Sequence, residues 1–200
     1  MKARWIFTSM GVAALAAATY ACHDLVPQDR IDAQGEEVDG YPVGEFHRPG
    51  QDCLACHGEQ SKSDVVFTVA GTIFAGPRNL TGVNQAEVQM TDAVGTTFIA
   101  HTNCVGNFFV KAEEWNPRFP VLVRVHKGTV AVQMNSQIGR QGSCASCHKR
   151  DKLTDEQLHD SVGRVQLFGG DEPMSTVTTS STADAGATDC PVDASIPGTP

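Results

Sequence analysis

The chain has 200 residues, a formal net charge of −8 and seven cysteines. This length allows one modest domain with extensions and excludes two large domains. The negative charge disfavours nucleic acid and anionic lipid as partners, although acidity by itself often serves only solubility.

The first 21 residues are typical of an export signal. Lys2 and Arg4 give a positive start, and the apolar run from Ile6 to Ala18 is too short to span a bilayer comfortably. Cys22 then follows small residues, where a bacterial lipoprotein carries its acylated cysteine or where an ordinary signal peptidase would cut. The sequence therefore predicts an exported protein, periplasmic or at the cell surface, whose only membrane contact would be a lipid on Cys22.

The rest of the chain divides by composition into five parts. Residues 22–44 are polar and are predicted to be a flexible tether, and residues 171–200 form a Ser-, Thr- and Pro-rich tail that is predicted to be disordered. Two cysteine-containing segments, 45–64 and 136–170, flank a β-branched central stretch over residues 65–135.

The central stretch is predicted to form an antiparallel β-sandwich. Six runs rich in β-branched and aromatic residues are separated by turn sequences. The expected strands cover residues 65–74, 87–91, 97–102, 106–111, 119–127 and 129–134. Alternation is clearest at Val121, Val123 and Val125, which are predicted to face the core. Short strands at this spacing favour a small sandwich, and a capping box at Thr154 and Gln157 adds one short helix over residues 152–161.

The order of motifs in this stretch resembles a known module. The runs AGTIFAG, GVNQAEVQMTDAVGTTFIAHTNCVGNFFVK and FPVLVRV place a G-T strand, a D-x-x-G turn, a T-T strand and a G-N-F strand in succession. Residues 65–127 are in this respect similar to the carboxypeptidase-regulatory-like (transthyretin-like) β-sandwich, apart from the loop at 76–83 and Cys104. Such modules bind or space rather than catalyse, so the resemblance implies a scaffold.

Four of the seven cysteines fall in two C-x-x-C-H units, Cys53-Leu54-Ala55-Cys56-His57 and Cys144-Ala145-Ser146-Cys147-His148. Two thiols at this spacing can form thioethers with the two vinyl groups of a porphyrin, and the next histidine can bind its iron. The chain thus resembles a c-type cytochrome with two covalent haems. The resemblance implies that the four cysteines attach haem c and that His57 and His148 are the proximal iron ligands.

A different chemistry is open to the same cysteines. Cys53, Cys56, Cys144 and Cys147 could together hold one zinc ion, or each pair could form a disulfide. Either arrangement leaves both histidines without a role, and export leads to the compartment where haem c is attached. Cys104 and Cys190 lie outside the motifs and could pair with each other.

The far side of each iron decides whether the haem is a closed electron carrier or an open site for small molecules. His126 and His47 are the favoured distal ligands, and Met134 is a further candidate that could equally fill the core. His47 precedes Cys53 by only six residues, which favours its use at the other haem. Six strands return the chain to the end at which it started, so the two motifs are expected to lie close together.

The predicted function is electron transfer between redox proteins of the periplasm or cell surface. One alternative is a dihaem peroxidase-like or small-molecule-binding haem protein. Another is a surface binding module in which the C-x-x-C pairs hold a structural metal or a disulfide.

Overall fold

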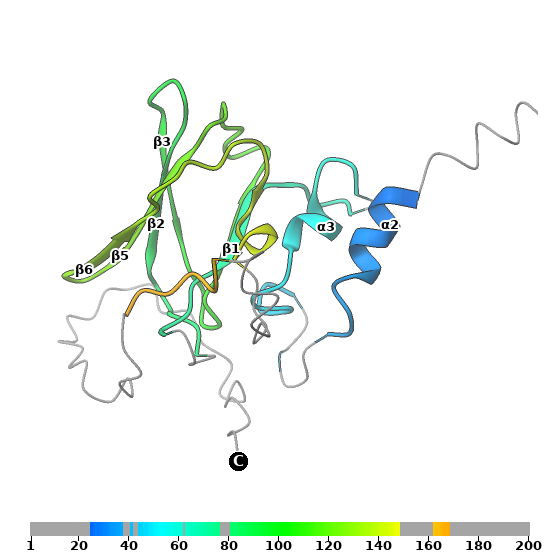
Figure 1. Ribbon diagram of the computed structural model, residues 1–200, viewed down its shortest axis with the longest axis horizontal. Coiled ribbons are helices and arrows are strands. Elements are labelled where there is room, and N and C mark those ends of the chain that lie inside the picture. Colours follow the sequence, from blue (N-terminus) through cyan, green and yellow to red (C-terminus); the bar gives the residue numbers. More distant parts are fainter. Residues whose placement is uncertain are drawn as a thin grey trace, which may run out of the picture. The chain divides into compact units, whose positions relative to one another are not determined.

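The structure is a computed structural model (Figure 1). It describes residues 25–37, 41, 44–61, 63–76, 81–148 and 162–168. The predicted export signal over residues 1–21, the helix over 152–161 and the tail from residue 171 lie outside these residues. Among the helices of the described residues, none is long and apolar enough to cross a membrane.

The chain divides into two units, residues 1–35 and 36–200. In the described part of the first unit, Leu25–Asp32 forms helix α2, in which Gln28 Nε2 donates a hydrogen bond to Asp32 Oδ1 at 2.8 Å. Gly35, with φ of 67°, follows the helix. The sequence predicts a tether here and does not identify this helix. Local contacts four residues apart support α2 without an apolar stripe, so periodicity does not reveal it.

The second unit is a β-sandwich of two sheets, which confirms the predicted fold class (Figure 1). One sheet has the order β4-β1-β7 and the other the order β3-β2-β5-β6. The strands are β1 (Phe67–Thr72), β2 (Glu87–Thr91), β3 (Thr97–His101), β4 (Asn107–Lys111), β5 (Leu122–Lys127), β6 (Val130–Gln133) and β7 (Gly142–Ser143). All pairs are antiparallel except β1 with β7, which is parallel. The six predicted strands are confirmed, whereas β7 was not predicted.

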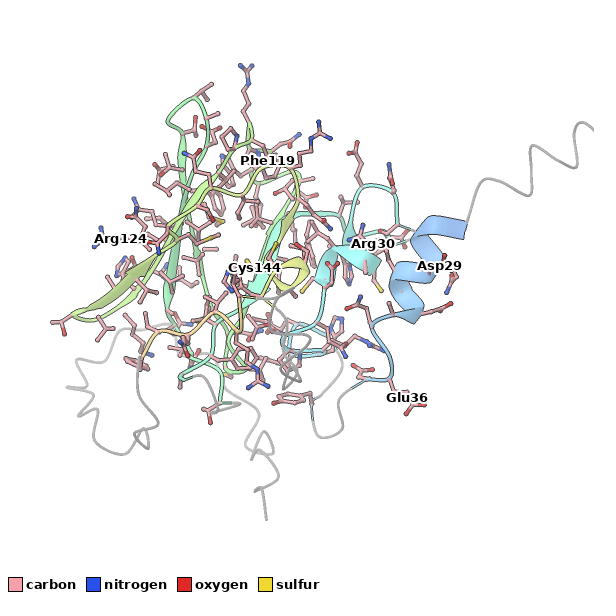
Figure 2. All side chains as sticks on the ribbon, viewed as in Figure 1. Asp29, Arg30, Glu36, Phe119, Arg124 and Cys144 are labelled. Atoms are coloured by element: carbon pink, nitrogen blue, oxygen red, sulfur yellow. The ribbon has the colours of Figure 1, made fainter. Side chains whose placement is uncertain are left out.

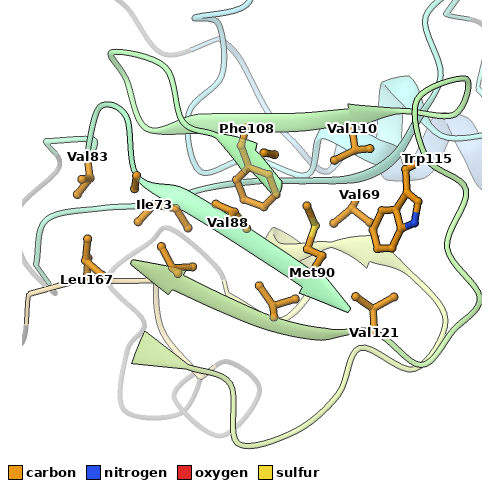
Figure 3. Packing of buried hydrophobic residues seen from close by; sticks show 14 of the residues in the cluster. Val69, Ile73, Val83, Val88, Met90, Phe108, Val110, Trp115, Val121 and Leu167 are labelled. Atoms are coloured by element: carbon orange, nitrogen blue, oxygen red, sulfur yellow. The ribbon is translucent and has the colours of Figure 1, made fainter. Parts of the chain in front are cut away.

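Apolar side chains from the two sheets meet in one core (Figure 3). Phe108 and Val110 of β4 face Val88 and Met90 of β2, and all four are at most 1 % exposed. Burying an aliphatic or aromatic side chain of this kind stabilises the fold by about 1.5–3 kcal/mol. Val121, Val123 and Val125 are likewise buried, which confirms the alternation predicted for β5.

Two turns between consecutive strands, one at Asp92 and one at Asn103, have the same construction. Asp92 Oδ1 accepts hydrogen bonds from the N–H groups of Val94 and Thr96, at 3.0 and 2.8 Å. Asn103 Oδ1 accepts in the same way from the N–H groups of Val105 and Asn107. A carboxylate or amide oxygen thus replaces a backbone acceptor in each turn.

Candidate functional site

The first C-x-x-C-H unit forms the short helix α3, Cys53–His57, where the sequence predicts an irregular segment. Asp52 caps this helix, because its Oδ1 accepts a hydrogen bond from the N–H of Leu54 at 3.1 Å. The N–H of Gly58 donates to the Leu54 carbonyl and closes the last turn. The helix places Cys53 and His57 four residues apart, on the same face.

The second unit follows directly on β7. Gly142 and Ser143 pair with Val69 and Ala70 of β1, and a 3₁₀ turn over Cys144–Ser146 comes next. The N–H of His148 donates to the Cys144 carbonyl at 2.8 Å. Each C-x-x-C-H unit therefore contains one helical turn that brings its histidine back beside its first cysteine.

Strand β1 brings the two C-x-x-C-H motifs together. Their closeness was expected, but the reason given for it, a return of the chain after six strands, is wrong, because β7 is a seventh strand between the motifs and pairs parallel with β1. Both α3 and the 3₁₀ turn contact β1, and α3 also contacts β7. Gly71 of β1 permits the close approach, since a Cβ there would lie 2.7 Å from Cys144 Sγ and 3.1 Å from the Phe108 ring. Figure 2 shows Cys144 between the sheets and α3. Cys53 is near enough for its negative charge to act on the Cys144 thiol.

The first thiol of each unit is held in the protonated form. Burial raises the pKa of Cys53 from 9.0 to about 12, and the charge of Asp52 adds to the effect. Burial also raises the pKa of Cys144 to about 12, with the charge of Cys53 as the second cause. Both residues are partly exposed as whole residues, but their thiol groups are surrounded by protein. Cys147, in contrast, is exposed.

Both motif histidines are oriented by their Nδ1 atoms. His57 Nδ1 lies 3.0 Å from the Val65 carbonyl and 2.9 Å from Ser63 Oγ, and His148 Nδ1 lies 2.7 Å from the Gly163 carbonyl. A metal-binding histidine usually donates its second ring N–H to a carbonyl or carboxylate, which fixes the ring and leaves the other nitrogen for the metal. In each motif, two cysteines outside any disulfide and an imidazole held in this way fit covalent haem c.

Aromatic packing further fixes the first imidazole. The His57 ring stacks on Phe67 of β1 with centroids 4.6 Å apart, and Phe67 stacks on Phe109 of β4 at 4.8 Å. These residues form an aromatic row across two paired strands. The row and the Nδ1 contacts together hold the imidazole before any ligand arrives.

A cavity of about 680 Å³ lies beside the second unit. Its wall includes Cys144, Cys147 and His148 together with Val123, Val125 and Met134. A volume of this size is within the range of cofactor and small-molecule sites, of about 300–1,000 Å³. The residues that line it include one histidine, His148, and one methionine, Met134.

The three candidate distal ligands are in different places. His47 lies beside His57, with ring centroids 6.0 Å apart. The structure thus places it at its own motif, whereas the sequence favoured its use at the other haem. Met134 lines the cavity that contains His148. His126 Nε2 lies 2.8 Å from Glu87 Oε2 on the outer face of the four-stranded sheet, and the structure brings it to neither motif.

The zinc arrangement gains no support. Within the described ranges, no group of three or more His, Cys, Asp or Glu side chains could hold a metal ion. The four motif cysteines are not in disulfides, whereas Cys104 is disulfide-bonded. Cys22 and Cys190 lie outside the described residues, so the lipid and the predicted partner of Cys104 stay predictions.

Some residues that shape the site were not identified from sequence. Thr72 and Asn107 are buried polar residues that fix the loop before Cys53. Thr72 belongs to the G-T run and Asn107 to the G-N-F run, so those motifs were a signal for both, whereas Ser63 stands in no motif. Comparison with family models, with curated proteins and with solved structures finds no match to this chain.

Proposed function

We propose that the protein is an exported dihaem c-type cytochrome that transfers electrons between redox proteins of the periplasm or cell surface. One observation carries the proposal: each C-x-x-C-H histidine has its Nδ1 on a backbone carbonyl, in the same turn as two cysteines that are not in a disulfide. Oriented imidazoles of this kind are what an iron ligand requires and what a plain disulfide does not.

The roles of the residues follow from this arrangement. Cys53, Cys56, Cys144 and Cys147 form the thioether links, and the Nε2 atoms of His57 and His148 bind the irons. Haem, when bound, supplies one-electron chemistry. The backbone carbonyl on each Nδ1 makes the imidazole more basic, which favours ferric iron and lowers the reduction potential.

The two motifs share strand β1, and this arrangement supports electron exchange between two haems. Because both motifs pack on β1, their attachment points are fixed close together on a rigid element, which suits electron exchange between the two haems. The net charge of −8 favours redox partners with basic docking surfaces.

The cavity favours a second candidate function. An apolar space of about 680 Å³ beside His148 could admit a small molecule to the second iron, as in a peroxidase-like or gas-binding haem protein. Carbon monoxide added to the reduced protein separates the two functions, because it binds an open iron at once and a closed carrier weakly.

The primary test is haem content. The exported protein should stain for haem on a denaturing gel and give a pyridine haemochrome spectrum equivalent to two haems per chain. The double variants Cys53→Ala/Cys56→Ala and Cys144→Ala/Cys147→Ala should each retain one haem, and each serves as the control for the other. A wild-type chain without covalent haem, made in a host that attaches haem c, would refute the proposal and favour the surface binding module.

A further inference from the structure

We propose that His47 is the second axial ligand of the iron bound by His57, so that the first haem is closed by two histidines. This inference rests on the proposed function. It assigns the distal ligand of the first site. The second site differs from the first, because its histidine lies beside a cavity that is lined by Met134.

The separation of the two imidazoles is the first argument. Two imidazoles on opposite sides of one metal, each with a metal–nitrogen bond of about 2 Å, have ring centroids about 6 Å apart. The centroids of His47 and His57 are 6.0 Å apart. Their planes make an angle of 57°, and rotation about the metal–nitrogen axes leaves this angle free. The spacing for a bis-histidine iron is therefore present in the folded chain.

The orientation of His47 is the second argument. Its Nδ1 makes a short contact with the carbonyl oxygen of Gly44, just as the Nδ1 of His57 faces the carbonyl of Val65. Both rings thus use Nδ1 for a backbone carbonyl and retain Nε2 for a ligand bond.

A chain of buried hydrogen bonds holds the loop that carries His47. The N–H of Gly50 donates to Thr72 Oγ1, and the Thr72 hydroxyl donates to Asn107 Oδ1, both at 2.7 Å. Asn107 Nδ2 then donates to the carbonyls of Glu45 and His47, at 3.3 and 3.0 Å.

Thr72 and Asn107 are only 5 % and 6 % exposed, on the same two strands that carry the Phe67–Phe109 stack under His57. The loop is therefore ordered before iron binds, which lowers the entropy cost of ligation.

The loop also has the backbone shape that a return toward α3 needs. Arg48 has φ of 51° and Gly50 has φ of 79°, both in the left-handed region. These two residues flank Pro49 and reverse the chain, so that a histidine six residues before Cys53 faces the histidine four residues after it. A non-glycine residue at positive φ is uncommon and usually marks a constrained turn.

The experiment compares carbon monoxide binding by the reduced wild-type protein with that of two variants, alongside their haem content. His47→Ala should bind one more carbon monoxide per chain than the wild type, because it opens one iron. His126→Ala is the matched control, since this histidine pairs with Glu87 on the other sheet, and it should bind the same amount as the wild type.

A third variant, His47→Met, keeps a ligand in place and guards against poor folding of the alanine variant. It should raise the midpoint potential of one haem and leave the other unchanged, because methionine favours ferrous iron. Both His47 variants could carry two haems and still match the wild type in carbon monoxide stoichiometry and in potentials. That result would overturn the role of His47 and leave the proposed function standing. Absence of covalent haem from the wild type would overturn the proposed function as well.

Discussion

The buried thiols of Cys53 and Cys144 predict that the folded, haem-free protein reacts slowly at these two positions. The pKa of each thiol is raised from 9.0 to about 12. Only the thiolate is nucleophilic, so at pH 8 the reactive fraction falls from about one in ten to about one in ten thousand. Alkylation should therefore be about a thousandfold slower than at an ordinary thiol.

The assay is timed alkylation with iodoacetamide at pH 8, followed by peptide mass spectrometry, on protein made without haem attachment. Cys147 is exposed and one turn from Cys144, so it is the internal comparison for the second motif, and Cys56 serves the first. In denaturant the rates within each pair should agree within a few fold. Equal rates in the folded protein, with native circular dichroism, would refute the assignment of Cys53 and Cys144 as buried thiols.

The raised pKa values of the same two thiols predict that the folded, haem-free protein becomes less stable at alkaline pH. Between pH 9 and 12 the unfolded chain has lost the two protons that the folded chain retains. The folded haem-free protein therefore has its full stability from these groups below pH 9 and loses it as the pH rises toward 12. Urea titrations at pH 8 and 10 measure the loss, and Cys53→Ser/Cys144→Ser should show a smaller one. Under the proposed function, thioether formation needs reactive thiols, so haem attachment would precede the packing of α3 on β1.

Four substitutions test the scaffold. Gly142→Ala would place a Cβ 1.9 Å from the Thr68 carbonyl oxygen, so it should destabilise the β7–β1 pair by more than about 3 kcal/mol in urea unfolding. Gly139→Ala has no neighbour within 4 Å and should change stability by less than about 0.5 kcal/mol. Met134→Ala should cost about 1–2 kcal/mol, because the side chain is half-buried, and should leave the spectrum of the first haem unchanged. Asn107→Ala should cost about 1–3 kcal/mol and should let a fraction of the first haem bind carbon monoxide.

Local rules account for most of what the sequence predicts correctly. The strands follow from β-branched residues with period two, and Val121, Val123 and Val125 are buried as that period requires. The turns at Asp92 and Asn103 follow from side chains that accept hydrogen bonds from nearby N–H groups. The C-x-x-C-H units are local as well, since one helical turn joins the first cysteine to the histidine.

Features that depend on partners distant in sequence were missed. Strand β7 has two residues and no apolar pattern, and it exists because Gly142 can approach the backbone of Thr68 and Val69. Its parallel pairing with β1 is a tertiary contact that composition does not encode. The location of His47 was missed for a related reason, because its short separation from Cys53 suggests a span too small to reach over the same iron. The reversal at Arg48 removes that objection.

The two sites share a strand but differ in what surrounds them. On the first side, buried hydrogen bonds tie the His47 loop to β1 and β4, and aromatic stacking fixes His57. On the second side, His148 faces a cavity whose wall offers Met134. Histidine ligation lowers the potential of a haem relative to methionine ligation or an open iron. A chain built in this way would hold one haem of low potential beside one of higher potential, and electrons that enter at the first would pass downhill to the second.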